Sequence, residues 1–269
     1  MALRQIGWAA GCLSLVSLFG ACTGRADEEA PGTTTDEENE TGSHGGAHDE
    51  TGAGAETSDT DSGSDLGGTV PDPESIDCRS DGDGLTTLVF ANGCATAVTF
   101  RGSDIDDGTL EPGEFVCIDL GTDAEPINSK RYWGFSGQDP GAEHHTLAEF
   151  TFNTDFNDFD WYNISHVDAH NLPLQIVPVG RSDCEVLTCQ ENWLESCPDE
   201  GQFKDDAGET IACVSPDRDN AQSPVAQFFE ACDEAYAWSG DDQHGDDPSP
   251  MRACAGEDWD IVFCPEAEP

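Results

Sequence analysis

The sequence predicts a mainly β protein, an antiparallel β-sandwich with disulfide-braced loops and one short helix near the C-terminus. After Cys78 the chain consists of short apolar segments separated by turn residues, a pattern typical of sandwiches. The 269 residues also include 12 cysteines but only 10 Lys and Arg. This composition indicates an oxidising compartment in which the cysteines pair. A zinc site is the weaker alternative, because the chain has no Cys-x-x-Cys pair.

The first two expected strands, 86–90 and 95–100, flank Asn92-Gly93. Both residues of this pair accept positive φ, so we expect a β-hairpin at this point. Four later apolar segments are also expected to be strands, namely 115–120, 131–135, 172–179 and 260–264.

One helix is expected near the C-terminus. Ser223 can cap its start, Pro224 suits the first helical position, and Gly240 ends it. Between these positions the apolar residues recur at helical spacing; they are Val225, Phe228, Phe229, Cys232, Ala235 and Tyr236.

Residues 1–22 have the features of an export signal. Arg4 precedes an apolar run over 6–19, and Gly20-Ala21-Cys22 follows it. At about 15 residues the run is short for a membrane span, so we expect it to be removed or processed. Its end is similar to a bacterial lipoprotein cleavage box, which would place a lipid on Cys22. Plain secretion is the alternative.

Residues 23–75 are expected to be a disordered acidic linker rich in Gly, Ser and Thr, and 76–269 to be the folded domain. The linker has almost no large apolar residue, so it cannot bury enough surface to offset its conformational entropy. The formal net charge of −46 makes nucleic acid and anionic membrane surfaces improbable partners. Contact with a membrane is expected only through a lipid on Cys22.

The segment Leu147–Pro173 combines acidic and amide side chains with aromatic ones. Sugar hydroxyls bond to carboxylates while sugar C–H faces stack on rings, so this mixture predicts a carboxylate-lined groove over an aromatic floor. The polar members are Glu149, Asp155, Asp158, Asp160, Asn163 and Asp168, and the aromatic members are Phe150, Phe152, Phe156, Phe159, Trp161 and Tyr162.

Ordered blocks over about 85–267 resemble thaumatin-like proteins. The family has a Leu-Ala-Glu-aromatic run, an Asp-aromatic-Tyr-Asp block, a Cys-Pro-Asp-Ala-Tyr block and a Phe-Cys-Pro close. The matching segments here are Asn92-Gly-Cys94, Leu147-Ala-Glu-Phe150, Asp160–Pro173, Cys232–Trp238 with Asp241-Asp242, and Trp259–Pro265.

This resemblance implies a thaumatin-like fold and a specific set of disulfides. Between Arg131 and Glu149 the chain is shorter than in plant members, which implies a compact form with a shallower cleft. The implied pairs are Cys94–Cys264, Cys184–Cys254, Cys189–Cys232 and Cys197–Cys213, which leaves Cys78–Cys117 outside the family's usual set.

The resemblance also implies an acidic cleft made of Arg131, Glu149, Asn163, Asp168 and Asp242. The family has an aspartate where Asn163 stands, and an amide cannot carry the charge or take up a proton. If the protein is an enzyme, Glu149 is the expected acid, with its pKa raised by aromatic neighbours, and Asp168 the second carboxylate.

We therefore expect an exported protein, tethered to the bacterial envelope or secreted, that binds β-1,3-glucan or a related glycan. Weak endo-β-1,3-glucanase activity through Glu149 and Asp168 is one alternative, and a protein-binding or inhibitor role is another. No cofactor or metal is expected, and the protein is expected to be a monomer. His166 and His170 would share a face only on a helix, so packed or exposed histidines are expected instead of metal ligands.

Overall fold

A computed structural model describes residues 78, 84–122, 124–155, 157, 159–243 and 249–265. All of them belong to one compact unit, Thr60–Pro269. The expected export signal, its Cys22 and the linker 23–75 lie outside the described residues. Among the described residues, no helix has the length and apolar composition that a membrane crossing requires.

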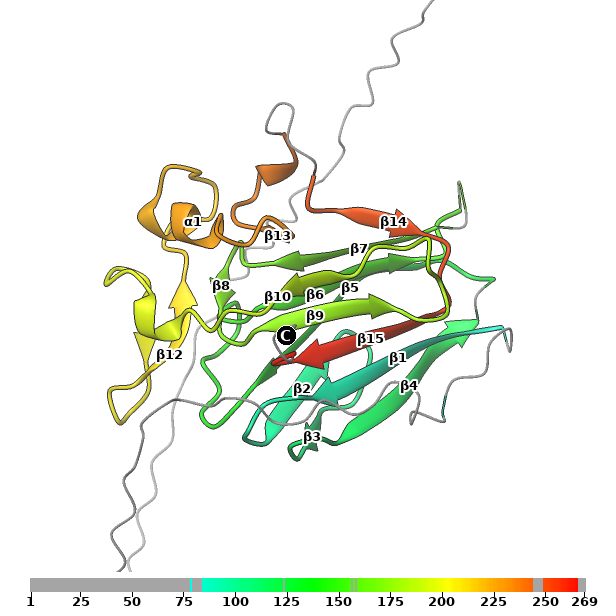
Figure 1. The fold of residues 1–269 in the computed structure, drawn as a ribbon, viewed down its shortest axis with the longest axis horizontal. Coiled ribbons are helices and arrows are strands. Elements are labelled where there is room, and N and C mark those ends of the chain that lie inside the picture. Colours follow the sequence, from blue (N-terminus) through cyan, green and yellow to red (C-terminus); the bar gives the residue numbers. More distant parts are fainter. Residues whose placement is uncertain are drawn as a thin grey trace, which may run out of the picture. The chain divides into compact units, whose positions relative to one another are not determined.

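The described strands form three sheets (Figure 1). One has the order β10-β9-β15-β1-β4, the second β11-β12-β8, and the third β13-β7-β6-β5-β2-β3 with β14 also paired to β7. The strands are β1 (Leu85–Asn92), β2 (Val98–Gly102), β3 (Gly108–Leu110), β4 (Phe115–Thr122), β5 (Ile127–Phe135), β6 (Leu147–Phe152), β7 (Asp160–Ser165), β8 (Ala169–His170), β9 (Leu174–Pro178), β10 (Leu187–Cys189), β11 (Gln202–Lys204), β12 (Thr210–Val214), β13 (Ala235–Tyr236), β14 (Arg252–Cys254) and β15 (Asp258–Phe263).

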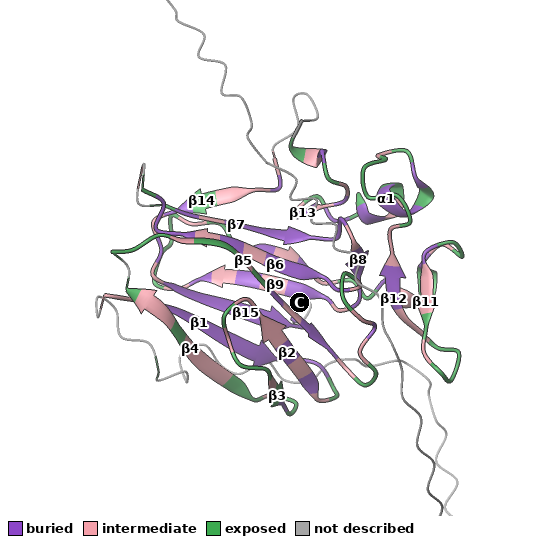
Figure 2. Ribbon diagram, turned by 180° about the vertical axis from the view of Figure 1, so that it is seen from behind, coloured by how far each residue is buried: buried purple, intermediate pink, exposed green. Residues whose placement is uncertain are grey.

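The first and third sheets pack face to face around one hydrophobic core, which confirms the predicted mainly β sandwich. All six residues of β15 are buried, and Figure 2 shows β1, β7 and β15 buried along nearly their whole length. Rings from the two sheets meet in the core: Phe90 stacks on Phe100 at 4.8 Å, and the ring centroids of Tyr162 and Trp259 lie 4.5 Å apart. Two strand pairs, β1 with β15 and β13 with β7, run parallel.

The expected hairpin at Asn92-Gly93 is wrong. β1 pairs with β15 and β4, whereas β2 pairs with β3 and β5 in the opposite sheet. Neither Asn92 nor Gly93 has a positive φ. The buried Asn92 amide instead donates hydrogen bonds to the carbonyls of Thr96 and Leu110, both at 2.9 Å. These bonds hold the crossing between the sheets, so a long-range pairing overrides the local turn preference.

The predicted helix is present but shorter than expected. α1 spans Pro224–Phe229, and the Ser223 hydroxyl caps it by accepting from the Ala226 N–H at 3.0 Å. Its expected second half instead contains β13, which pairs with the edge of β7. Pairing satisfies backbone groups that a helix end leaves free. Among the described residues, the short 3₁₀ helices η2 (Leu194–Ser196) and η3 (Asp241–Gln243) lie in the connections.

Five disulfides brace the described chain: the four pairs that the resemblance implied, and the pair of Cys78 with Cys117 that it left over. They are Cys78–Cys117, Cys94–Cys264, Cys184–Cys254, Cys189–Cys232 and Cys197–Cys213.

Candidate functional site

Three predicted cleft residues lie side by side on neighbouring strands. The register pairs Arg131 of β5 with Glu149 of β6, and Glu149 with Asn163 of β7. Side chains alternate between the faces of a strand, and the neighbours Tyr132, Ala148 and Tyr162 are fully buried in the core. Arg131, Glu149 and Asn163 therefore form a row on the outer face of the sheet.

Direct contacts link this row. Arg131 Nε lies 2.9 Å from Glu149 Oε1, and Asn163 Nδ2 donates to Glu149 Oε2 at 3.1 Å. The Asn163 side chain is buried, while that of Glu149 is 26% and that of Arg131 is 57% exposed. Glu149 thus pairs with Arg131 through Oε1 and accepts a hydrogen bond from Asn163 on Oε2, and the carboxylate keeps acceptor capacity for a ligand.

Asp168 lies in the turn after β7 and pairs with a residue that the sequence did not point to. Arg218, from the segment between β12 and α1, places its Nη1 2.9 Å from Asp168 Oδ1. The Asp168 side chain is only 14% exposed, whereas that of Arg218 is 50% exposed. No motif includes Arg218, and the one available signal was the scarcity of cations in so acidic a chain.

Burial raises the pKa of Asp168 above its usual range. The neighbouring guanidinium of Arg218 opposes this effect, and the carboxylate of Glu143 reinforces it. Asp168 therefore takes up a proton more readily than an exposed aspartate does.

The remaining wall comes from the segment after α1. Tyr236 of β13 and the exposed Asp242 of η3 line the same depression as Arg131, Glu149 and Asp168, together with Leu147, Asn163, Ser165, Val167, Arg218, Ser239 and Met251. Its volume is about 240 Å³, below the roughly 300–1,000 Å³ usual for small-molecule sites. All five predicted cleft residues thus line one shallow depression.

The expected aromatic floor is absent from this depression. Phe150, Phe152 and Tyr162 point to the other face of the sheet and are buried in the core. The alternation of side chains along β6 is the physical reason, because Glu149 and Phe150 are adjacent and must face opposite ways. Tyr236 is the aromatic residue that contributes to the lining.

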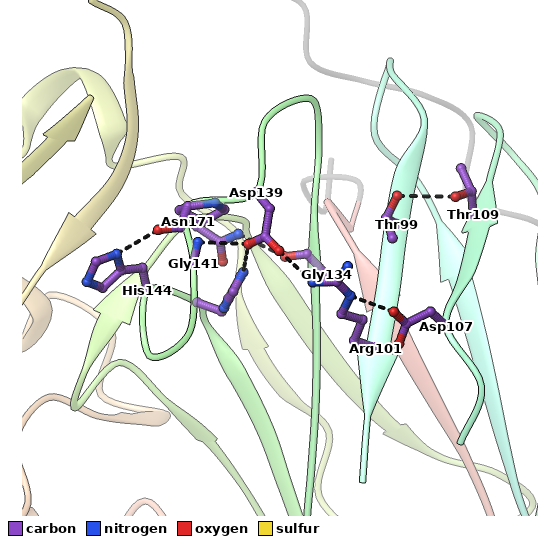
Figure 3. A network of polar contacts seen from close by, with 11 residues as sticks. Thr99, Arg101, Asp107, Thr109, Gly134, Asp139, Gly141, His144 and Asn171 are labelled. Atoms are coloured by element: carbon purple, nitrogen blue, oxygen red, sulfur yellow. Dashed lines mark hydrogen bonds and ion pairs between the residues drawn. The ribbon is translucent and has the colours of Figure 1, made fainter. Parts of the chain in front are cut away.

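The loop between β5 and β6 is held by a polar network (Figure 3). The Asp139 carboxylate accepts from the Gly141 N–H at 2.8 Å and pairs with Arg101, which also pairs with Asp107 at 2.8 Å. At the end of the loop, the Asn171 amide accepts from a backbone N–H of the loop at 2.8 Å and donates to the Gly134 carbonyl at 2.8 Å. The network fixes the start of β6, which holds Glu149.

The two histidines near the cleft are packed residues. His166 and His170 are fully buried with ring centroids 5.0 Å apart, and both contact Trp193. Among the described residues, no group of three or more His, Cys, Asp or Glu is placed to hold a metal ion.

Comparisons with known proteins point to one family. The model of the thaumatin family matches residues 136–225. A glucan endo-1,3-beta-glucosidase from Prunus avium is 30% identical over 172 residues, which cover 57% of this chain and 65% of that protein. Pathogenesis-related thaumatin-like protein 3.5 from Cryptomeria japonica is 29% identical over 240 residues, which cover 71% of this chain and 93% of that protein.

Coverage differs among the relatives. For the Prunus avium protein and two further ones, from Cryptomeria japonica and Solanum lycopersicum, this chain spans 65%, 52% and 56% of the relative's length. Among solved structures, a laminaripentaose-producing β-1,3-glucanase of GH family 64 from Paenibacillus barengoltzii, complexed with laminarihexaose, has a TM-score of 0.46. It is 12% identical and covers 71% of this chain and 78% of its own.

Proposed function

This chain belongs to the thaumatin family, and we propose that its cleft binds β-1,3-glucan or a related glycan without hydrolysing it. The observation that carries the proposal is the fixed row of Arg131, Glu149 and Asn163. It presents guanidinium donors and carboxylate acceptors on one surface, the groups that pair with sugar hydroxyls, and the buried Asn163 amide holds one of the carboxylate oxygens. The name of the Prunus avium relative supports a β-1,3-glucan as the ligand.

The contacts of the two carboxyl groups favour binding over hydrolysis. Glycoside hydrolysis needs one carboxyl that gives up a proton and a second that acts as base or nucleophile. Glu149 forms an ion pair with Arg131 and accepts a hydrogen bond from Asn163, and Asp168 forms an ion pair with Arg218. Each carboxyl is thus paired with a cation, which favours its ionised form, and the amide at Asn163 cannot act as an acid or a base.

Retention on insoluble β-1,3-glucan tests the proposal. The variant Glu149→Gln removes the charged acceptor and breaks the ion pair with Arg131, so we expect retention to fall by about tenfold. The matched control is Glu185→Gln, because Glu185 pairs with Arg252 in an ion pair outside the depression and is 69% exposed. Absence of retention for the unaltered protein would remove glucan binding as the function.

Weak endo-β-1,3-glucanase activity is the second candidate, and one observation favours it. Burial raises the pKa of Asp168, so this residue is the better candidate acid, with Glu149 as the second carboxylate. Release of reducing sugar from laminarin tests this candidate. The variant Asn163→Asp should create measurable release if the amide is what disables the cleft. If the Asn163→Asp variant binds glucan yet releases no reducing sugar, the hypothesis of glucanase activity is wrong.

We also propose that the protein is exported and tethered by a lipid on Cys22 through the linker 23–75. Five disulfides in the described domain support export, because disulfides persist in oxidising compartments. Mass spectrometry of the mature N-terminus tests the tether, since a lipid-modified Cys22 is expected. An unmodified N-terminus would indicate plain secretion.

If neither retention on glucan nor release of sugar is seen, crosslinking on intact cells tests the alternative of a protein partner.

A further inference from the structure

Arg218 is the cation closest to Asp168, and it reaches the cleft from a segment outside the three-strand row. We propose that Arg218 is a positioning residue, which holds the Asp168 carboxylate in place as an acceptor for the bound glycan. The inference rests on the proposed glycan binding. It identifies Arg218 as the residue that sets how far glycan binding at this site persists as the pH falls.

The segment that carries Arg218 is anchored at both of its sides. The Ser215 N–H donates to the Asp168 carbonyl at 2.8 Å. On the other side, the Ser239 N–H donates to the Arg218 carbonyl at 2.9 Å, and the Ser239 hydroxyl donates to Asp219 Oδ1 at 2.5 Å. These bonds hold the backbone of Arg218 beside Asp168, within reach of the ion pair between its guanidinium and the Asp168 carboxylate. A segment ordered before the ligand arrives lowers the entropic cost of binding.

The charges around Asp168 come from several elements. Arg218 and Arg131 favour the ionised carboxylate, whereas Glu143 and Glu149 disfavour it. Arg131 already pairs with Glu149. Loss of Arg218 would therefore leave Asp168 among carboxylates without a cation of its own. The titratable and charged groups that face or share its cleft are Arg131, Glu143, Glu149, Arg218, Tyr236 and Asp242.

This arrangement predicts how glycan binding depends on pH. An ionised Asp168 accepts sugar hydroxyls on its free lone pairs, whereas a protonated one loses both the charge and the ion pair. Binding should decline as the pH falls through the pKa of Asp168. Without Arg218 this pKa is higher, so the decline should begin at a higher pH.

The test compares Arg218→Gln and Arg218→Lys in the full chain. Carbon NMR of the aspartate carboxyls follows the titration of Asp168 without ligand, and glucan retention is measured from pH 4 to 8. We expect Arg218→Gln to raise the titration midpoint of Asp168 by about 0.5 to 1 pH unit. The shift is this small because the Arg218 guanidinium is half-exposed and solvent screens its charge. The pH at which glucan retention is lost in acid should rise by the same amount. For Arg218→Lys, both the Asp168 midpoint and this pH should lie between those of Arg218→Gln and of the unaltered protein.

Arg181→Gln is the matched control, because Arg181 pairs with exposed Asp183 at 2.9 Å outside the depression. It should change neither the midpoint nor retention. An unchanged Asp168 midpoint in Arg218→Gln overturns the inference, as does a loss of retention that is equal at every pH. If the unaltered protein is not retained on glucan, the proposed function fails, and the NMR titration still decides whether Arg218 acts on Asp168.

Discussion

Asp160 shows at the scale of one residue how burial and hydrogen bonding compete. Its side chain is fully buried, and it accepts from the Asn153 N–H at 2.8 Å and from Trp259 Nε1 at 2.9 Å. Burial raises the pKa of Asp160 to about 6, although both hydrogen bonds oppose the shift. The folded protein therefore favours the protonated carboxyl relative to the unfolded chain, in which the pKa is about 3.9.

This shift predicts a stability change with a definite sign. The stabilising contribution of Asp160 is present below about pH 4 and is lost as the pH rises through 6, by up to about 3 kcal/mol. In Asp160→Asn this part of the pH dependence should disappear. Urea unfolding at pH 4.5 and pH 7.5 measures it. Equal pH slopes for the variant and the unaltered protein would contradict the assignment.

The amide of Asn163, unlike the carboxyl of Asp160, lines the depression in which the proposed glycan would bind. It donates to Glu149, which an aspartate at this position could do only when protonated. One residue thus turns a potential carboxylate pair into a donor–acceptor pair. The proposal of a binder over a hydrolase depends on this position.

Two histidines link neighbouring elements beneath the cleft. His166 follows β7, His170 belongs to β8, and His166 packs at 5.4 Å from Phe229 of α1. Burial lowers the pKa of His170 to about 3 and that of His166 well below its usual range. Both rings are therefore neutral in the folded protein, and protonation would place a charge between packed elements.

Between about pH 3 and 6.5 the unfolded chain binds more protons at these histidines than the folded one does. Stability from this source should therefore fall as the pH falls through that range, opposite in sign to the effect of Asp160. We expect His170→Leu to lose less stability between pH 7 and pH 5 than the unaltered protein, measured by urea unfolding. The partly exposed His144, replaced by leucine, is the control. A larger loss in His170→Leu would refute the assignment.

At the scale of the whole domain, the disulfide Cys94–Cys264 joins the early part of the folded chain, just after β1, to its last strand, just after β15. It closes a loop with a sequence separation of 170, whereas Cys197–Cys213 has a separation of 16. In the chain-entropy model a bridge destabilises the unfolded state more when its loop is longer.

Removal of the long-range bridge Cys94–Cys264 should therefore lower the free energy of unfolding more than removal of the short bridge Cys197–Cys213. For the double alanine variants we expect a loss of about 5 kcal/mol for Cys94 and Cys264, and about 3 kcal/mol for Cys197 and Cys213. The short bridge is the matched control for the loss of a sulfur pair. Urea unfolding under oxidising conditions measures both, and equal losses would argue against the entropic origin.

Much of the cleft could be predicted from the sequence because its parts lie in local patterns. The row of Arg131, Glu149 and Asn163 follows from strand alternation together with the resemblance to the family. The same alternation predicts that Phe150 faces away from Glu149, so the aromatic floor was an error of interpretation. Arg218 could not be predicted, because its contact with Asp168 depends on how two distant loops meet.

The sequence by itself determined the mainly β class, the position of six of the fifteen described strands, the cap at Ser223 and the set of cysteines available for pairing. These properties depend on residues that are close in the chain. Only the tertiary structure decided that β1 and β2 belong to different sheets, that α1 ends at Phe229, and that Arg218 completes the cleft. The reason is that strand partners and loop contacts are chosen by packing across the whole domain, which overrides local preference.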